Sequence, residues 1–190
     1  MTRSRYPRRS VYGPVLKGEK ITLRPPDEAD AQGFIEWFAD QEVTRFLAHT
    51  MPLSLADERD FLKRVGESKN DVLWVIEVDG KAIGATGIHR IDWIDANATT
   101  GTVIGEKDEW RKGYGSEAMA LRTAYAFQQL NLHKLSSGAF LDNEPSKRAL
   151  LRAGYREVGI SREDFWRDGR WHDHWHCEVL RADWERGQAR

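Results

Sequence analysis

Hydrophobic and polar positions follow two different periods along this 190-residue chain, and the changes between them mark the expected elements. Runs rich in β-branched and aromatic residues predict strands at residues 15–24, 72–78, 82–88, 99–104, 134–140, 156–161 and 172–180. Apolar residues at helical spacing predict helices that begin near residue 27 and cover 55–65, 116–130 and 145–153. The dipeptides Asp79-Gly80 and Asp168-Gly169 lie between neighbouring strand runs and predict hairpin turns.

The order of these elements is typical of an α/β (α+β) domain, in which a mixed sheet carries helices on its faces. No linker or repeat divides the chain, so a single domain is expected over residues 15–182. Residues 1–14 hold four arginines ahead of any acidic residue and are expected to form a disordered or loosely packed basic tail. Residues 183–190 are expected to form a C-terminal tail.

Composition and charge argue against several classes of partner. The formal net charge is −1, so nothing in the overall balance favours nucleic acid or an anionic membrane surface. No apolar run approaches the roughly 20 residues that span a bilayer, and the basic N-terminus lacks the apolar stretch of a signal peptide. Cys177 is the single cysteine, which rules out an internal disulfide and favours a cytoplasmic location. We expect this thiol to be buried and structural.

The most specific feature is the loop at residues 110–116, which follows a predicted strand and leads directly into a helix. Gly113 and Gly115 carry no side chain that would obstruct a ligand, so successive backbone N–H groups can converge on an anion. The helix N-terminus adds further donors, and Arg111 and Lys112 lie beside it. A glycine pair of this kind is weak evidence alone. A dinucleotide fold is the competing interpretation, but the loop lies mid-chain and no acidic residue closes the next strand.

Two segments together resemble a known family. The loop is similar to the x-x-x-Gly-x-Gly/Ala coenzyme A signature of the GNAT N-acetyltransferases, and residues 143–155 resemble the Asn-x-x-Ser…Gly-Phe element that follows it there. Leu23-Arg24-Pro25 and the segment from Asp168 to His174 are similar to the branch of the RimJ/RimL ribosomal-protein-alanine and spermidine acetyltransferases. The resemblance runs from about residue 15 to residue 180.

This resemblance implies a GNAT fold with a mostly antiparallel sheet of about six or seven strands, splayed at the cofactor site. It implies an N-acetyltransferase that moves the acetyl group of acetyl-coenzyme A (acetyl-CoA), a co-substrate, directly to a primary amine acceptor. It is also compatible with a homodimer. The residues it assigns to acetyl-CoA binding are Val103, Ile104, Gly105, Arg111, Lys112, Gly113, Tyr114, Gly115, Ser116, Asn143 and Arg148.

The catalytic groups are less well specified. For the acid that protonates the departing thiolate we favour Ser146, with an N-terminal cap of the short helix as the alternative role. For the base that deprotonates the amine we favour His89, with Asp92, a packing role for the histidine, or a water chain as alternatives. Many family members have tyrosine at the position of Leu150, and many of the branch's ribosomal-protein enzymes have glutamate at that of Thr100. Most members also begin the loop with Gln or Arg, where this chain has Trp110.

His172, His174 and His176 would share one face of a strand, which raises the question of a metal. Ligands at this spacing on one strand converge poorly on a tetrahedral ion, so we expect no metal site and favour sheet packing or lining of the acceptor site.

The acceptor stays open at this point. A polyamine would require clustered acids, for which Glu77, Asp92, Asp95 and Glu106 are available, whereas a protein N-terminus would require an open groove. The alternative to an enzyme is a non-catalytic acyl-CoA-binding sensor.

Overall fold

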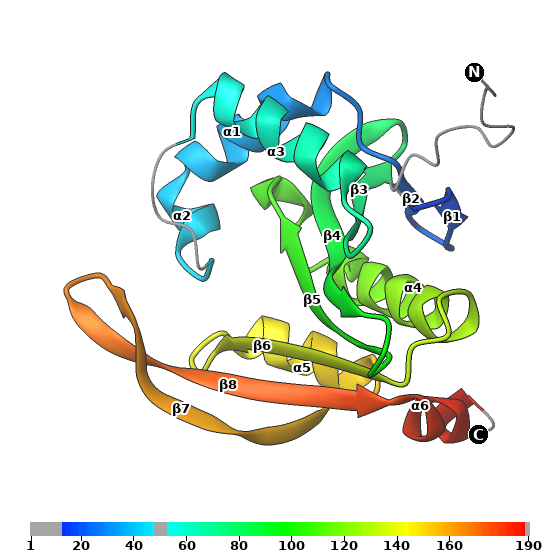
Figure 1. Ribbon diagram of the computed structural model, residues 1–190. Helices are drawn as coiled ribbons and strands as arrows, with labels where there is room; N and C mark the ends of the chain where they lie inside the picture. Colours follow the sequence, from blue (N-terminus) through cyan, green and yellow to red (C-terminus); the bar gives the residue numbers. More distant parts are fainter. Residues whose placement is uncertain (1–12, 48–52, 189–190) are drawn as a thin grey trace, which may run out of the picture.

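The computed structural model describes residues 13–47 and 53–188 and forms one sheet with helices on both faces (Figure 1). The strands are β1 (Leu16–Lys17), β2 (Thr22–Arg24), β3 (Val72–Val78), β4 (Lys81–Asp92), β5 (Asn97–Ile104), β6 (Lys134–Phe140), β7 (Arg156–Arg167) and β8 (Arg170–Leu180). The helices are α1 (Asp30–Ala39), α2 (Gln41–Thr44), α3 (Leu55–Glu67), α4 (Tyr114–Gln128), α5 (Glu144–Arg152) and α6 (Arg181–Gln188), with a short 3-10 turn, η1, at Lys107–Glu109. The basic tail expected at residues 1–14 lies almost entirely outside the described residues.

The strand order is β1-β2-β3-β4-β5-β6-β8-β7. Neighbouring strands are antiparallel except for β5 and β6, which are parallel. The predicted mixed, mostly antiparallel sheet is therefore confirmed. The described residues form eight strands rather than six or seven, because the expected first strand breaks into β1 and β2 at the turn where Gly18 N–H donates to Ile21 O.

Two apolar layers hold the sheet between its helices. On one face α4 and α5 bury residues such as Ala118, Phe127 and Leu150 against the central strands. On the other face α1, α2 and α3 pack on β3 through a separate cluster that includes Phe34 and Val75. Each layer buries the apolar stripe of its helices, which is the condition for a stable three-layer arrangement.

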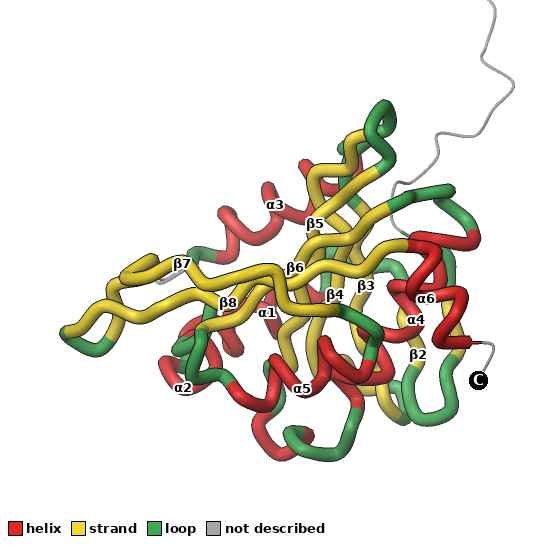
Figure 2. Tube along the Cα trace, turned by 90° about the horizontal axis from the view of Figure 1, so that it is seen from below, coloured by secondary structure: helices red, strands yellow, loops and turns green. Residues whose placement is uncertain are grey.

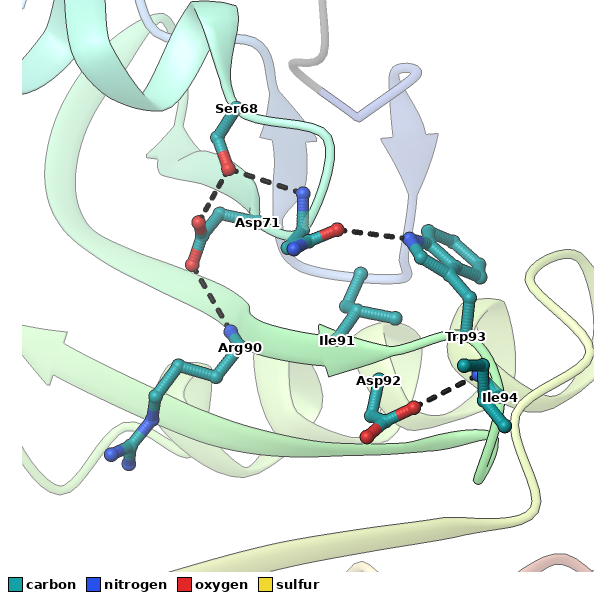
Figure 3. Close-up of a pocket in the computed structure, with 8 residues that line it drawn as sticks. Ser68, Asp71, Arg90, Ile91, Asp92, Trp93 and Ile94 are labelled. Carbon is teal, nitrogen blue, oxygen red and sulfur yellow. Dashed lines mark hydrogen bonds between the residues drawn. The ribbon is translucent and has the colours of Figure 1, made fainter.

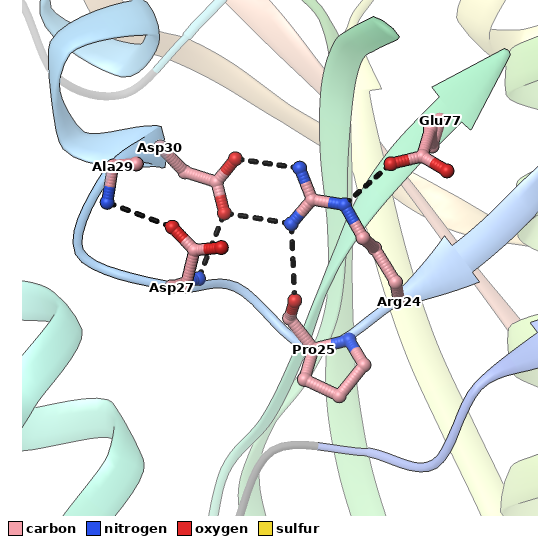
Figure 4. A network of polar contacts seen from close by, with 6 residues as sticks. All are labelled: Arg24, Pro25, Asp27, Ala29, Asp30 and Glu77. Carbon is pink, nitrogen blue, oxygen red and sulfur yellow. Dashed lines mark hydrogen bonds and ion pairs between the residues drawn. The ribbon is translucent and has the colours of Figure 1, made fainter. Parts of the chain in front are cut away.

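The segment Leu23-Arg24-Pro25 has a clear structural role, because Arg24 joins three elements (Figure 4). Its Nη1 and Nη2 donate to the two carboxylate oxygens of Asp30 at 2.8 and 2.7 Å, and its Nε donates to Glu77 Oε2 at 2.6 Å. Asp30 is the first residue of α1, and its side chain is 7% exposed. The two-pronged contact therefore fixes the start of α1 to the end of β2 and to β3.

Two parts of the chain differ from the sequence expectations. The hairpin of β7 and β8 is longer than predicted and extends beyond the rest of the sheet (Figure 2), with Trp166 and Trp171 in contact near its tip. The segment expected to be a C-terminal tail begins as helix α6, whose Trp184 packs on Phe127. The arms of this hairpin and the short helix α6 have weak local sequence patterns, so tertiary packing determines the extent of both. None of the described helices is long and apolar enough to cross a membrane.

Candidate functional site

The candidate site lies where the parallel strands β5 and β6 diverge. Their backbone pairing ends at Thr99 and Ser136, after which two side-chain bonds join them, from Thr100 Oγ1 to Ser136 O and from Ser137 Oγ to Thr100 O. Beyond this point β5 continues beside β4 alone, and Figure 1 shows the two strands separating. We call this divergence the splay. It is the feature that the family resemblance implied.

The phase of the β4–β5 ladder decides which groups face the splay. Gly105 N–H donates to Ile83 O at 2.9 Å, so alternate residues from Gly105 backwards along β5, including Val103, direct their N–H groups at β4. The intervening residues, Thr102 and Ile104, direct theirs at the splay. No described residue accepts from either of these N–H groups. Two of the three strand residues predicted to bind the cofactor, Val103 and Gly105, therefore have their N–H groups engaged within the sheet, whereas Thr102, whose N–H faces the splay, was not among the predicted residues.

A second set of donors comes from the N-terminus of α4. Gly113 is the residue before the helix and has φ of 92°, a left-handed conformation that favours glycine. The first intrahelical bond runs from Glu117 N–H to Gly113 O. The N–H groups of Tyr114, Gly115 and Ser116 precede that bond and are free to bind an anion. A Cβ on Gly115 would meet only the Ile104 side chain, at 3.6 Å, so this helix start lies next to the end of β5.

The loop is attached to the strand through Trp110. Its indole Nε1 donates to Ile104 O at 2.9 Å, and its ring packs on the cluster beneath α1 and α3. Arg111 and Lys112 are both exposed, and a hydrogen bond with Glu109 raises the pKa of Lys112. Two cations therefore stand beside the free N–H groups, which is the donor set that a diphosphate requires.

We expect Trp110→Phe to loosen this attachment while keeping the aromatic packing. Loss of the bond to Ile104 O should lower the free energy of unfolding by about 1 kcal/mol and raise the KM for acetyl-CoA about threefold. Urea unfolding and steady-state kinetics measure the two effects. Trp93→Phe is the matched control, because Trp93 lies on the distant β4–β5 turn and its indole bonds to Lys69 O and Asn70 Oδ1, between α3 and β3. An unchanged KM in the Trp110 variant would contradict the assigned role.

The second motif segment starts α5. Asn143 is the N-cap, and its Oδ1 accepts from Ser146 N–H at 3.3 Å. The alternative role considered for Ser146, that of helix cap, is therefore wrong: Asn143 fills it, because its side chain stands three residues earlier. The Ser146 hydroxyl lies in the first turn and is half-buried, whereas Arg148 is exposed, 4.0 Å from Glu144.

On the face of the sheet covered by α1 and α3, the splay has a floor of glycines. Cross-strand register places Gly87 opposite Gly101 and Gly138 opposite His176, all on that face. A Cβ on Gly87 would lie 2.5 Å from His89 Nε2, and one on Gly138 would lie 2.4 Å from His174 Nε2. The missing side chains thus make room for two imidazoles, one on each side of the splay.

His89 is one of these imidazoles and was the predicted base. Its Nδ1 lies 3.4 Å from Asp71 Oδ1, so that the other ring nitrogen, Nε2, is directed across Gly87. Burial lowers the pKa of His89 below its ordinary value of 6.5, although Asp71 opposes this shift. The imidazole is therefore neutral at pH 7, and Nε2 can accept a proton.

The histidines of β8 divide into two groups. His172 is buried and contacts Asp142 at 3.5 Å and the ring of Phe140. The rings of His174 and His176 are in tilted contact, with centroids 4.3 Å apart, and they bond to Asp164 and Ser161 of β7, respectively. The potential ligand atoms of Asp164, His174 and His176 lie within 4.8 Å of one another, a set that the sequence did not suggest because Asp164 belongs to the preceding strand. The absence of a metal site stays a prediction.

Comparison with known proteins decides the family. A model of the acetyltransferase (GNAT) domain matches residues 20–156, which include both motif segments. The chain belongs to the GNAT acetyltransferase family. It is therefore an acetyl-CoA-dependent acyltransferase.

Individual relatives agree with this assignment. The uncharacterized N-acetyltransferase YoaA of Bacillus subtilis (strain 168) is 29% identical over 161 residues, which cover 82% of this chain and 90% of YoaA. The putative ribosomal N-acetyltransferase YdaF of the same organism is 30% identical over 174 residues, covering 88% and 94%. A solved structure of spermidine N-acetyltransferase from Vibrio cholerae, in complex with CoA and spermine, has the same fold at a TM-score of 0.82, with 19% identity and 88% and 99% coverage.

Two departures from the family pattern have structural consequences in this GNAT domain. Leu150 is 1% exposed within the core beneath α4 and α5 and supplies no proton donor. Thr100 bonds to Ser136 O and to the hydroxyl of Tyr155, so it braces the start of the splay and is no carboxylate base. These two positions cannot supply the acid and the base here, so Ser146 stays the candidate acid and His89 the candidate base.

The acids considered for a polyamine site are dispersed in this GNAT domain. Glu77 pairs with Arg24, Glu106 pairs with Lys81, and Asp92 Oδ1 accepts from the N–H groups of Ile94 and Asp95. A cavity of about 600 Å³ does border Asp92, but it lies at the β4–β5 turn (Figure 3), at the end of β5 opposite the splay. Its lining residues are Ser68, Asn70, Asp71, Arg90, Ile91, Asp92, Trp93 and Ile94.

Proposed function

We propose that this chain is an N-acetyltransferase of the RimJ/RimL-like branch that acetylates a protein or peptide α-amine. The observation that carries the proposal is the position of His89 Nε2, a neutral acceptor over the glycine floor of the splay. A single domain over residues 15–182 would hold the complete site. Its location in the cytoplasm and its assembly as a homodimer stay predictions.

The acceptor class follows from proton affinity. An α-amine has a pKa of about 7.7–8.0, whereas a lysine-like or polyamine group is near 10.4. A base whose pKa lies below 6.5 removes a proton far more readily from the α-amine. The dispersed acids also argue against a polycation. The likeness to the putative ribosomal N-acetyltransferase YdaF supports the same class of acceptor.

In the proposed reaction, acetyl-CoA lies with its diphosphate at Tyr114–Ser116 and its thioester in the splay. The free N–H groups of Thr102 and Ile104 stabilise, in this proposal, the oxyanion that forms when the amine attacks. His89 takes the amine proton, with Asp71 orienting the ring and stabilising the charged form. Ser146 is the candidate donor to the departing thiolate.

Thiol release from acetyl-CoA, measured with DNTB against a panel of amines, tests this function. We expect turnover on a short peptide with a free α-amine, none on its N-acetylated copy, and a kcat/KM at least about tenfold lower for spermidine. A preference for spermidine would overturn the acceptor class. Binding of CoA without turnover on any amine would favour the non-catalytic sensor, which nothing in the fold or the relatives supports.

The pH dependence tests the base. Because the pKa of His89 is lowered, its neutral base form is present down to pH values below 6.5. As the pH decreases, kcat/KM should therefore fall only below pH 6.5. His89→Gln should lower kcat/KM about thirtyfold at pH 7 and remove this acid limb. His133→Gln, at an exposed imidazole before β6, is the matched control. An unchanged pH profile in the His89 variant would exclude His89 from the mechanism.

A further inference from the structure

Arg122 of α4 is a buried cation with no counter-charge. The residue is 0% exposed and reaches the underside of β4 and β5. Its Nη1 donates to Gly101 O and to Thr102 Oγ1, each at 2.8 Å, and to Thr86 Oγ1 at 2.9 Å. All these acceptors are neutral, and within the described ranges no carboxylate forms an ion pair with Arg122. Its Nε is buried without a hydrogen-bond partner.

The nearest titratable neighbours do not supply the missing charge. Burial raises the pKa of the Cys177 thiol to about 12, so this neighbour is neutral at physiological pH. His89 feels the guanidinium charge through the sheet, but burial already keeps its imidazole neutral. The third neighbour is the hydroxyl of Tyr155, which accepts from Nη2 at 3.5 Å. A full positive charge thus stands uncompensated beside the splay.

The neighbours of Arg122 do not need it as a hydrogen-bond donor. The Thr86 and Thr102 hydroxyls bond to each other at 2.8 Å, and Thr86 also donates to Gly101 O. The Tyr155 hydroxyl bonds to Thr100 Oγ1. An apolar side chain in place of Arg122 would leave each of these groups with a partner. Because burying an unpaired charge costs stability, packing alone does not account for an arginine at this position.

The contact with Gly101 O links Arg122 to the site. Gly101 O and Thr102 N–H belong to the same peptide group: its carbonyl is directed at β4, and its N–H is directed at the splay. A guanidinium on the carbonyl draws electron density toward the oxygen and makes the N–H a stronger donor. Arg122 thereby acts on a group that faces the reacting atoms without touching them.

We propose that Arg122 is a positioning residue that stabilises negative charge in the splay during acetyl transfer. The inference rests on the proposed function, in which the amine nitrogen bonds to the thioester carbon and the carbonyl electron pair moves to oxygen. When that oxyanion collapses, the carbon–sulfur bond breaks, its electron pair leaves on sulfur, and the amine proton goes to the base. The oxyanion and the thiolate both carry negative charge. The positive charge of Arg122 stabilises them, through space and through the polarised Thr102 N–H.

Two substitutions separate this role from a structural one. Arg122→Met should lower kcat about tenfold or more and change the KM for acetyl-CoA less than about threefold, with no loss of thermal stability. Arg122→Lys retains the charge and should restore most of kcat. If Arg122→Met is destabilised, and Arg122→Lys equally impaired, the role is structural and the proposal is overturned.

Coenzyme A itself reports on the charge. The wild-type protein should bind CoA more tightly as the pH rises through the thiol pKa, about 8.5 for a free thiol, while desulfo-CoA shows no such gain. In Arg122→Met the gain should disappear, and the affinity for desulfo-CoA should not change. A gain of the same size in the variant would overturn the proposal. Wild-type protein that shows the gain but acetylates no amine would instead overturn the proposed function and support the role of Arg122.

Discussion

Gly115→Asp is expected to weaken acetyl-CoA binding about a hundredfold without destabilising the fold. The side chain has room, because a Cβ at this position would meet only Ile104 at 3.6 Å. A carboxylate in the first turn of α4 also interacts favourably with the helix dipole, which stabilises the folded protein by about 0.3–1 kcal/mol. It would stand roughly 5 Å from a bound diphosphate, where repulsion between one charge and two amounts to about 3 kcal/mol at an effective dielectric constant of about 40.

Gly115→Asn is the control, since it has nearly the same shape without the charge. It should weaken CoA binding less than about tenfold. Isothermal titration with CoA and urea unfolding of all three proteins give the comparison. Equal losses of affinity in the Asp and Asn variants would mean that bulk, not charge, matters at this position. Unchanged affinity in the Asp variant would place the diphosphate elsewhere.

Arg24→Ala is expected to lower the free energy of unfolding by about 3 kcal/mol. The substitution leaves the carboxylate of Asp30, whose side chain is 7% exposed, without its two charged donors. Breaking a buried ion pair costs about 3–5 kcal/mol, and the value here is at the lower end because the Arg24 side chain is 24% exposed. Asp27 N–H would remain as a donor to Asp30 at 2.8 Å.

Two further variants show whether the loss comes from the stranded carboxylate. Arg24→Lys keeps the charge but not the two-pronged geometry, and should lose about half as much. Asp30→Asn in the Arg24→Ala background removes the charge and should recover part of the stability. Urea unfolding measures all four proteins. A loss below about 1 kcal/mol in Arg24→Ala would show that the contact is weak, as exposed ion pairs are.

Much of the fold could be predicted from local patterns. β3 and β6 have the predicted bounds. For β3, a nearly continuous apolar run and the Asp79-Gly80 turn that follows it fix these bounds. α4 begins at Tyr114, two residues before the expected start, since the left-handed Gly113 ends the loop there. The short α2 and the long arms of β7 and β8 could not be predicted, because tertiary contacts, not periodicity, hold them.

The donor groups of the proposed cofactor loop could be predicted from the sequence, because a single chain segment supplies them. The groups expected to face the amine acceptor could not be predicted, because they come from separate segments of the chain. Asp71 approaches His89, and Asp164 approaches His174, only once the sheet forms. The choice of Thr102 and Ile104 over Val103 and Gly105 depends on the phase of the β4–β5 ladder. The sequence already implies that successive N–H groups along the strand point in opposite directions. Which set faces β4 and which faces the splay depends on the pairing of the two strands, a tertiary property.

Amide-resolved hydrogen exchange, followed by NMR with and without CoA, tests the cofactor site most directly. Val103 and Gly105 should exchange slowly in the free protein, because their N–H groups already bond within the sheet. CoA should slow exchange at Thr102 and Ile104 and at the helix start, Tyr114–Ser116. Protection at these amides and little change at Val103 and Gly105 is the predicted result. Bound CoA that leaves Thr102, Ile104 and the start of α4 unprotected would contradict the site described here.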